Sequence, residues 1–184
     1  MTIRKFGLVT VLVAALSAAA CAATRTQQAA GEVIDDSVIT TKIKASLVDD
    51  PTTKARQIDV KTFRGIVQLS GFVDTAAAKS RAAELALQTK GVTRVDNNLE
   101  VRSTDTSVGT TIDDSVLTTK VKAALIANPT TKARQISVET LRGVVQLSGF
   151  VDSAKEKDEA TEVAKSVTGV KDVHNELEVK QPTS

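Results

Sequence analysis

The sequence predicts an α+β protein made of two tandem αββαβ domains, each a three-stranded sheet with two helices on one face. Two observations carry this prediction. Residues 34–102 align without a gap with residues 112–180, and roughly 43 of the 69 aligned positions are identical. Within each copy, hydrophobic residues change from helical spacing to strand-like alternation and back again. The chain therefore contains one small structural unit twice.

The first helix of each copy is expected to follow the sequence Ile-Asp-Asp-Ser-Val, which occurs at 34–38 and again at 112–116. Asp36 is a natural N-cap, and Pro51 ends the hydrophobic run. The residues at helical spacing are Ile39, Ile43, Ser46 and Leu47 in the first copy and Leu117, Val121, Ala124 and Leu125 in the second.

A β-hairpin is expected after the first helix. Alternating residues over 58–62 predict one strand, and Arg64-Gly65 turns the chain into a second strand over 66–73. A second helix should then begin with Asp74 as its N-cap and end at Gly91. Its inward stripe consists of Ala78, Ala82, Leu85 and Ala86, and a last strand carries Val95, Leu99 and Val101.

The N-terminal residues have the three parts of a secretory signal peptide: Arg4 and Lys5, an apolar run over 6–16, and small residues over 17–23. The apolar run of about 11 residues is too short to cross a bilayer, which needs about 20 helical residues. We therefore expect the protein to be exported.

Two interpretations of Cys21 are open. Ala18, Ala19 and Ala20 lead into Cys21 and resemble the lipobox of bacterial lipoproteins, which implies a lipid anchor on Cys21 and attachment to the outer membrane of a Gram-negative bacterium. Ordinary cleavage at Ala20-Cys21-Ala22 would instead remove the cysteine. The predicted segments are a signal peptide at 1–21, a tether at 22–31, a domain at 32–103, a linker at 104–111 and a second domain at 112–180.

Composition argues against several classes of function. The chain has one Cys, one His and no Trp or Tyr, so it lacks the residues for a Cys/His zinc site, a His-dependent catalytic triad or a base-stacking platform. Once Arg4 and Lys5 leave with the signal peptide, the 24 basic residues become 22, against 22 acidic ones. This zero net charge argues against nucleic acid as a partner. We expect no enzyme activity, metal, cofactor or small-molecule substrate.

Three repeated motifs carry a resemblance to a known family. Each copy has Asp-Asp-Ser-x-(Ile/Leu)-Thr-Thr-Lys in the first helix, Val-Gln-Leu-Ser-Gly-x-Val in the second strand and Gly-Val-x-x-Val-x-Asn-x-Leu at the end. The chain thereby resembles the BON-domain family over nearly all of its length after the signal peptide. The resemblance implies a bacterial cell-envelope protein linked to osmotic and envelope stress, whose domains attach to phospholipid or to other envelope proteins. It implies no catalytic residue.

The first helices are where the resemblance implies membrane contact. The candidate residues for binding lipid headgroups are Lys42, Lys44, Lys120, Lys122 and Val116. Asp49 and Asp50 offset the lysines of the first copy, whereas Ala127 and Asn128 replace them in the second. If either helix binds acidic lipid, the second should bind better. The alternative is that these lysines form only a solvated helix face.

Hydrophobic residues on the outward face of the sheets form a second candidate surface. Phe72 and Phe150 have the opposite strand parity from Leu69 and Leu147, so one of the two sets points away from the helices. The candidate residues for an interdomain or protein-binding surface are Ile66, Phe72, Val144 and Phe150. His174 is expected to be a solvated strand residue and not a metal ligand.

Taken together, these features predict a monomeric, non-enzymatic envelope protein that binds membrane phospholipid or envelope proteins under osmotic stress. The alternative is a soluble periplasmic holdase, a chaperone that would capture unfolded envelope proteins on the same exposed hydrophobic sheet residues.

Overall fold

The computed structural model describes residues 35–53, 58–102 and 113–181, which belong to one compact unit. We call residues 35–102 domain 1 and residues 113–181 domain 2. The predicted signal peptide, Cys21, the tether at 22–31 and the linker at 104–111 lie outside the described residues.

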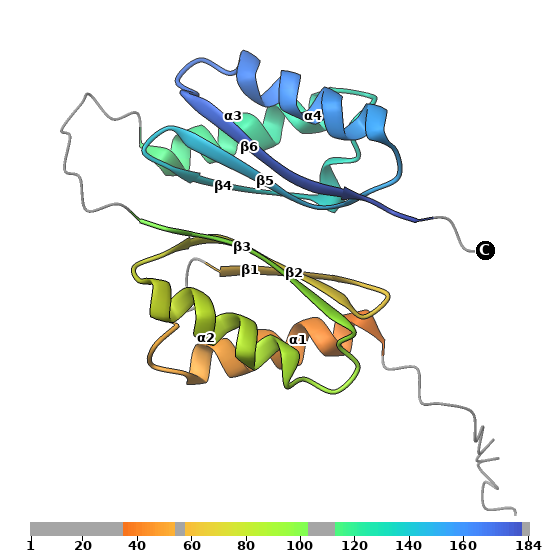
Figure 1. Cartoon of the computed structure of the whole chain (residues 1–184). Coiled ribbons are helices and arrows are strands. Elements are labelled where there is room, and N and C mark those ends of the chain that lie inside the picture. Colours follow the sequence, from red (N-terminus) through yellow and green to blue (C-terminus); the bar gives the residue numbers. More distant parts are fainter. Residues whose placement is uncertain (1–34, 54–57, 103–112, 182–184) are drawn as a thin grey trace, which may run out of the picture. The chain divides into compact units, whose positions relative to one another are not determined.

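Each domain has the element order αββαβ (Figure 1). Domain 1 contains α1 (Asp36–Asp49), β1 (Ile58–Phe63), β2 (Ile66–Val73), α2 (Ala76–Leu87) and β3 (Arg94–Val101). Domain 2 contains α3 (Asp114–Ala127), the short 3₁₀ helix η2 (Ala133–Gln135), β4 (Ile136–Leu141), β5 (Val144–Val151), α4 (Ala154–Ser166) and β6 (Asp172–Val179).

The two sheets have the same topology. The strand orders are β1-β2-β3 and β4-β5-β6. The first two strands of each sheet form an antiparallel hairpin, and the third pairs parallel to the central strand. A parallel pair needs a crossover connection, and α2 and α4 supply it. Both helices of each domain cover the same face of its sheet, which confirms the predicted fold class.

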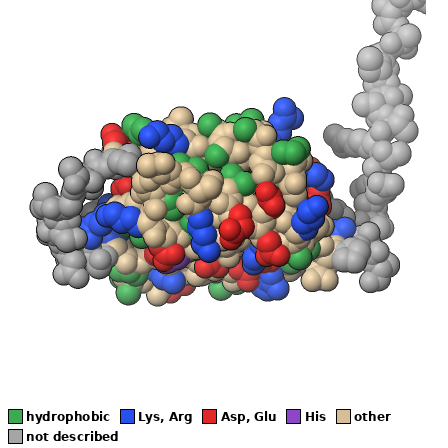
Figure 2. Space-filling model, turned by 90° about the horizontal axis from the view of Figure 1, so that it is seen from above, with side chains coloured by type: hydrophobic (Ala, Val, Ile, Leu, Met, Phe, Trp, Pro, Cys, Tyr) green, Lys and Arg blue, Asp and Glu red, His purple; other side chains and the backbone are tan. Residues whose placement is uncertain are grey.

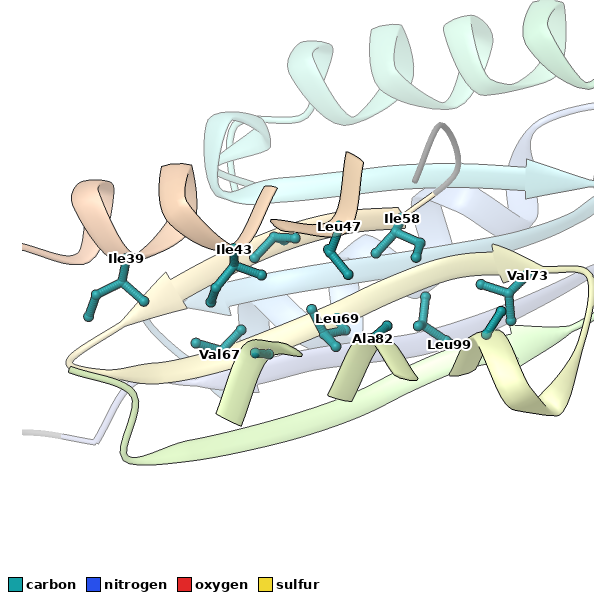
Figure 3. Packing of buried hydrophobic residues seen from close by; sticks show 12 residues of the cluster. Ile39, Ile43, Leu47, Ile58, Val67, Leu69, Val73, Ala82 and Leu99 are labelled. Atoms are coloured by element: carbon teal, nitrogen blue, oxygen red, sulfur yellow. The ribbon is translucent and has the colours of Figure 1, made fainter. Parts of the chain in front are cut away.

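The core of each domain lies between the sheet and its helices (Figure 3). Ile39, Ile43 and Leu47 of α1 are at most 1% exposed and pack against the sheet, in one cluster with Val67 and Leu69 of the central strand. On α2 the buried residues are alanines, which allow the helix to lie close to the sheet. Burying each large aliphatic side chain contributes about 1.5–3 kcal/mol, so this stripe is a main source of stability in a small domain.

The helix caps differ from those the sequence predicted. Asp35, and not Asp36, is the N-cap of α1, because its carboxylate accepts from the Ser37 N–H at 2.7 Å. Thr75, and not Asp74, caps α2. The helix α2 ends at Leu87, and Gly91 (φ 99°) lies in the turn that leads to β3.

Asp36 has a different role, which is to hold the turn of the hairpin. Its two carboxylate oxygens accept from the backbone N–H groups of Arg64, at 2.6 Å, and Gly65, at 2.8 Å. Both turn residues have positive φ, as a two-residue hairpin turn requires. Asp114 holds Arg142 and Gly143 in the same way. The two adjacent aspartates therefore divide two tasks: one caps the helix, and the other ties it to the hairpin.

Candidate functional site

The predicted headgroup-binding residues all lie on the solvent side of α1 and α3. Lys42, Lys44, Lys120 and Lys122 are exposed. Val116 is 47% exposed, near the beginning of α3. The structure therefore leaves these side chains accessible to a ligand.

The lysines of the two helices differ in their ion pairs. Lys44 of α1 lies 3.3 Å from the carboxylate of Asp59 on β1. The position equivalent to Asp59 in domain 2 is Ser137, so Lys122 has no such partner. Among the described residues, Lys120 and Lys122 form no ion pair. Burial raises the pKa of Glu139 on β4, and the nearby charge of Lys122 opposes this shift. Lys44 of α1 therefore has a direct ion pair that Lys122 of α3 lacks.

A groove lies beside the end of α3. It has a volume of about 570 Å³ and is lined by Ile126, Thr131, Lys132, Ala133, Arg134 and Gln135. A second hollow of about 260 Å³ shares three of these residues and adds Lys122, Leu125 and Ile136. Ile126 is 73% exposed. The groove and the second hollow together therefore combine hydrophobic walls with the basic side chains of Lys122, Lys132 and Arg134.

The wall of this groove is fixed by a buried carboxylate. Glu156 of α4 is 3% exposed and accepts from the N–H of Lys132 at 2.7 Å and the N–H of Asp152 at 3.2 Å. Lys132 itself pairs with Asp152, and this hydrogen bond, with that of Lys180, lowers the pKa of Asp152 to about 2. Domain 1 has Ala78 in place of Glu156. Residues 54–57 of domain 1, which are equivalent to the groove residues 132–135, lie outside the described residues.

The groove residues were only partly identified from the sequence. Lys122 was among the predicted headgroup-binding residues, but Ile126 gives no signal, because a hydrophobic residue near the end of a helix is ordinarily part of a core. On the face of the molecule in Figure 2, basic, acidic and hydrophobic side chains are interspersed without one continuous basic area. Anion recognition on this face would therefore depend on small local groups of basic side chains.

The second predicted surface lies between the two sheets. Phe72 and Phe150 are both 7% exposed, yet neither belongs to the core cluster of its own domain. The ring of Phe150 lies 5.5 Å from the ring of Phe63 in domain 1. Ile66 and Val144 are half-buried. The sheet faces that carry no helices thus meet each other.

Polar residues at the centre of this interface were missed from the sequence. Gln68, Ser70, Gln146 and Ser148 are each 1% exposed. Gln68 Oε1 accepts from the Gly149 N–H, and Gln146 Oε1 accepts from the Gly71 N–H, both at 2.6 Å. The amide Nε2 atoms donate to the carbonyl oxygens of Glu176 and Asn98. The available signal was the alternation Gln-x-Ser-x-Phe, which places these polar side chains on the same face as the phenylalanines.

His174 is also part of the interface and is not merely solvated. Its Nδ1 atom lies 2.5 Å from Glu100 Oε1 of domain 1, and this hydrogen bond raises the pKa of His174. At the opposite rim, Arg94 binds Glu178 at 3.0 Å. Burial and a hydrogen bond with Asp96 raise the pKa of Glu178.

The described ranges contain neither a candidate metal site nor a candidate membrane span. Within residues 35–53, 58–102 and 113–181, no group of three His, Cys, Asp or Glu side chains could hold a metal ion. In the same ranges, no helix is long and apolar enough to cross a membrane.

The chain is similar to several known proteins. The chain is 44% identical over 151 residues to "Osmotically-inducible protein Y" of Escherichia coli K12, covering 82% of this chain and 75% of that protein. It is 37% identical to "Outer membrane lipoprotein DolP" of Haemophilus influenzae, covering 78% and 74%. It is 36% identical to the "21 kDa hemolysin" of Actinobacillus pleuropneumoniae, covering 79% and 75%.

The family model described as BON domain matches this chain twice, over residues 35–103 and 113–181. These matches coincide with the two αββαβ domains of the structure. The chain therefore belongs to the BON-domain family.

Proposed function

We propose that this protein acts in the bacterial cell envelope, in the response to osmotic stress, by binding anionic phospholipid through α3 of domain 2. The names of two relatives, "Osmotically-inducible protein Y" and "Outer membrane lipoprotein DolP", support the envelope and the stress response. The signal peptide predicted at 1–21 supports export, and lipidation of Cys21 would add a membrane anchor.

The observation that carries the proposal is the difference between α1 and α3. Both helices expose two lysines, but Asp59 pairs with Lys44 in domain 1 and a serine replaces that aspartate in domain 2. The later residues Asp49 and Asp50 of domain 1 are Ala127 and Asn128 in domain 2. The carboxylates of Asp49, Asp50 and Asp59 therefore have no counterpart in domain 2, where Glu139 of β4 is the carboxylate near Lys122.

The groove supplies the second part of a phospholipid site. A phospholipid carries a phosphate close to its apolar acyl chains. In this proposal Lys122 and Arg134 bind the phosphate, and Ile126 and Ala133, which line the same hollow, make hydrophobic contact beside them. Each basic residue near an anionic surface contributes about 1 kcal/mol, so a few such residues give weak, reversible binding. Attachment of this strength would depend on salt.

Vesicle sedimentation tests the proposal. The chain from residue 24 onward, which lacks the signal peptide and Cys21, is mixed with phosphatidylglycerol–phosphatidylcholine vesicles and with pure phosphatidylcholine vesicles, at low and at high salt. We expect binding to the anionic vesicles alone, and we expect high salt to weaken it.

A matched pair of variants locates the site. Lys120→Glu with Lys122→Glu should abolish most of the binding, because it reverses the charges on α3. Lys42→Glu with Lys44→Glu makes the same change in net charge on α1 and should have a smaller effect. Equal losses from the two pairs would mean that only overall charge matters, and the assignment to α3 would be wrong.

The holdase alternative relies on exposed hydrophobic sheet residues. Two of its four residues, Phe72 and Phe150, are covered by the sheet of the other domain. Capture of unfolded protein on these residues would therefore require the domains to separate. It should also resist high salt, unlike headgroup binding, so the salt series distinguishes the two functions.

A further inference from the structure

The two sheet faces that meet between the domains carry the same residues at their centres. Gln68, Ser70, Gly71 and Phe72 of domain 1 recur as Gln146, Ser148, Gly149 and Phe150 of domain 2. Each glutamine bonds to the equivalent glycine and to the equivalent strand carbonyl of the other domain. The contact thus has the pattern of a two-fold symmetric interface, in which one surface recognises itself.

Two positions of the repeat lie on this approximate two-fold axis, because the residue at each of them contacts the equivalent residue of the other domain. The first is occupied by serine in both domains, and the Oγ atoms of Ser70 and Ser148 are 2.7 Å apart. The second is Asp59 in domain 1 and Ser137 in domain 2, and the Ser137 hydroxyl donates to Asp59 Oδ2 at 2.6 Å. Only the second position distinguishes the two faces on the axis.

The unlike pair at this position determines which faces fit together. The side chain of Asp59 is only 20% exposed. Two copies of domain 1 would place one Asp59 against another, and each carboxylate would lose the donor that Ser137 supplies. Lys44 and Lys61, which act on the charge of Asp59, offset this repulsion but cannot replace the buried hydrogen bond. Two copies of domain 2 would place Ser137 against Ser137, which can bond as Ser70 and Ser148 do.

The charged rim has less influence on this choice. In a pair of two domain 2 faces, His174 would meet Glu178 in place of Glu100, and Asp172 would approach the same Glu178. The side chain of Asp172 is 63% exposed. Solvent and salt screen such a contact, whereas the partly buried position on the axis is screened much less.

We propose that the sheet face of domain 2 is a docking surface for domain 2 of a second copy of this chain, and that Asp59 excludes the corresponding pairing of two domain 1 faces. The tethered domain 1 of the same chain competes for the surface at an effective concentration in the millimolar range for a short linker. Pairing between chains is therefore expected only when protein is concentrated or held together.

Cysteine reporters on the axis test the proposal. Residues 22–184 contain no cysteine, so Ser148→Cys alone reports contact between two domain 2 faces and Ser70→Cys alone reports contact between two domain 1 faces. Each variant is oxidised at about 1 mM protein, near the effective concentration of the linker, and the rate of disulfide-linked dimer formation is measured. Ser80→Cys, on the exposed surface of α2, gives the rate of random collision.

We expect the Ser148→Cys chain to form dimers at least about tenfold faster than the Ser70→Cys chain, which corresponds to about 1.4 kcal/mol. Adding Asp59→Ser should raise the Ser70→Cys rate to the level of Ser148→Cys. If Ser148→Cys and Ser70→Cys form dimers at equal rates while Asp59 is present, Asp59 does not exclude the pairing of two domain 1 faces. Dimers from Ser80→Cys only would show that the sheet face does not accept a second copy.

Exchanging the two residues provides an independent test that keeps one aspartate and one serine in every chain. In the chain with Asp59→Ser and Ser137→Asp, the hydrogen bond between residues 59 and 137 can still form. The serine at position 59 is then the donor and the aspartate at position 137 the acceptor. Pairing of two domain 2 faces should then be the excluded contact. Added to this exchanged chain, Ser70→Cys should therefore form dimers quickly and Ser148→Cys slowly. An unchanged order of rates would contradict the proposal, and unchanged thermal melting confirms that the variants fold.

Discussion

The hydroxyl oxygens of Ser70 and Ser148 lie 2.7 Å apart although the two residues are separated by 78 positions in the sequence. Their contact is buried and is flanked by two buried glutamines. A buried polar network has to be fully hydrogen-bonded to be tolerated, and one that is satisfied only in a single alignment fixes that alignment. The serines and glutamines therefore determine how the sheets meet, while Phe72 and Phe150 add hydrophobic burial.

The first prediction concerns Gln68. Its side chain accepts from the Gly149 N–H and donates to the Glu176 carbonyl. Replacing it with alanine leaves both backbone groups of domain 2 without this partner, and each buried unsatisfied group costs about 1–3 kcal/mol. Gln68→Ala should therefore lower the free energy of unfolding by at least about 2 kcal/mol, measured by urea denaturation.

Gln146→Ala should have the same effect, because Gln146 makes the equivalent two hydrogen bonds to domain 1. The exposed residue Gln88 supplies the control, and Gln88→Ala should change stability by less than about 0.5 kcal/mol. If Gln68→Ala lowers the free energy of unfolding by no more than Gln88→Ala does, the sheet faces do not remain in contact in solution.

The second prediction concerns pH and the one histidine of the chain. The hydrogen bond with Glu100 raises the pKa of His174 above its ordinary value of 6.5. A raised pKa in the folded state contributes stability that is fully present below pH 6.5 and is lost as the pH rises through the folded-state pKa. The free energy of unfolding should therefore fall over this range, and His174→Gln should remove that part of the pH dependence.

Because no other histidine is present, its ring protons can be followed by NMR without ambiguity. Glu100→Gln is the informative variant, since it removes the charge on domain 1 and leaves domain 2 unchanged. The pKa of His174 should then move down toward 6.5. A pKa that is already at or below 6.5 in the unmodified protein would show that His174 and Glu100 do not pair.

Much of the fold could be predicted from the sequence because each domain repeats local patterns. Helical spacing, strand alternation and Arg64-Gly65 identify the elements, and the duplication supports each assignment twice. The caps were harder to place. Adjacent aspartates at 35 and 36 are both suitable N-caps locally, and only the position of the hairpin turn decides that Asp36 bonds to Arg64 and Gly65.

The interface was only half predictable, for a related reason. Strand parity shows that Phe72 needs to be covered, but parity does not say which protein covers it. The bonds of Gln68 depend on the position of Gly149 in the other domain, which is a long-range relationship. The groove beside α3 depends similarly on Glu156, which lies in a different helix from Ile126.

The third prediction separates the two adjacent aspartates. Asp35→Ala removes an N-cap and should cost about 1 kcal/mol. Asp36→Ala removes two charge-assisted bonds to the turn and should cost about 1–2 kcal/mol. The decisive measurement is hydrogen exchange of the Arg64 and Gly65 amides, which should lose protection in Asp36→Ala alone. Faster exchange of these amides in both variants would mean that Asp36 does not hold the turn.

The fourth prediction links the buried Glu156 to lipid binding. Glu156→Ala introduces the residue that domain 1 has at this position, and it leaves the N–H groups of Lys132 and Asp152 without their acceptor. The free energy of unfolding of domain 2 should fall by about 1–3 kcal/mol. The loop 131–135 should then shift, and the groove that it lines should lose its shape.

Binding of Glu156→Ala to anionic vesicles shows whether lipid binding depends on the shape of the groove or only on charge. Removing one carboxylate makes the protein more positive, so simple electrostatics predicts tighter binding. If Ile126 and Arg134 act together as walls of one groove, Glu156→Ala should instead bind more weakly at temperatures where it is fully folded. Glu156→Gln makes the same change in charge but keeps an acceptor oxygen for the Lys132 N–H, so it should bind at least as well as the unmodified protein. Tighter binding by both variants would show that headgroup recognition needs only the charges of α3 and not the shape of the groove.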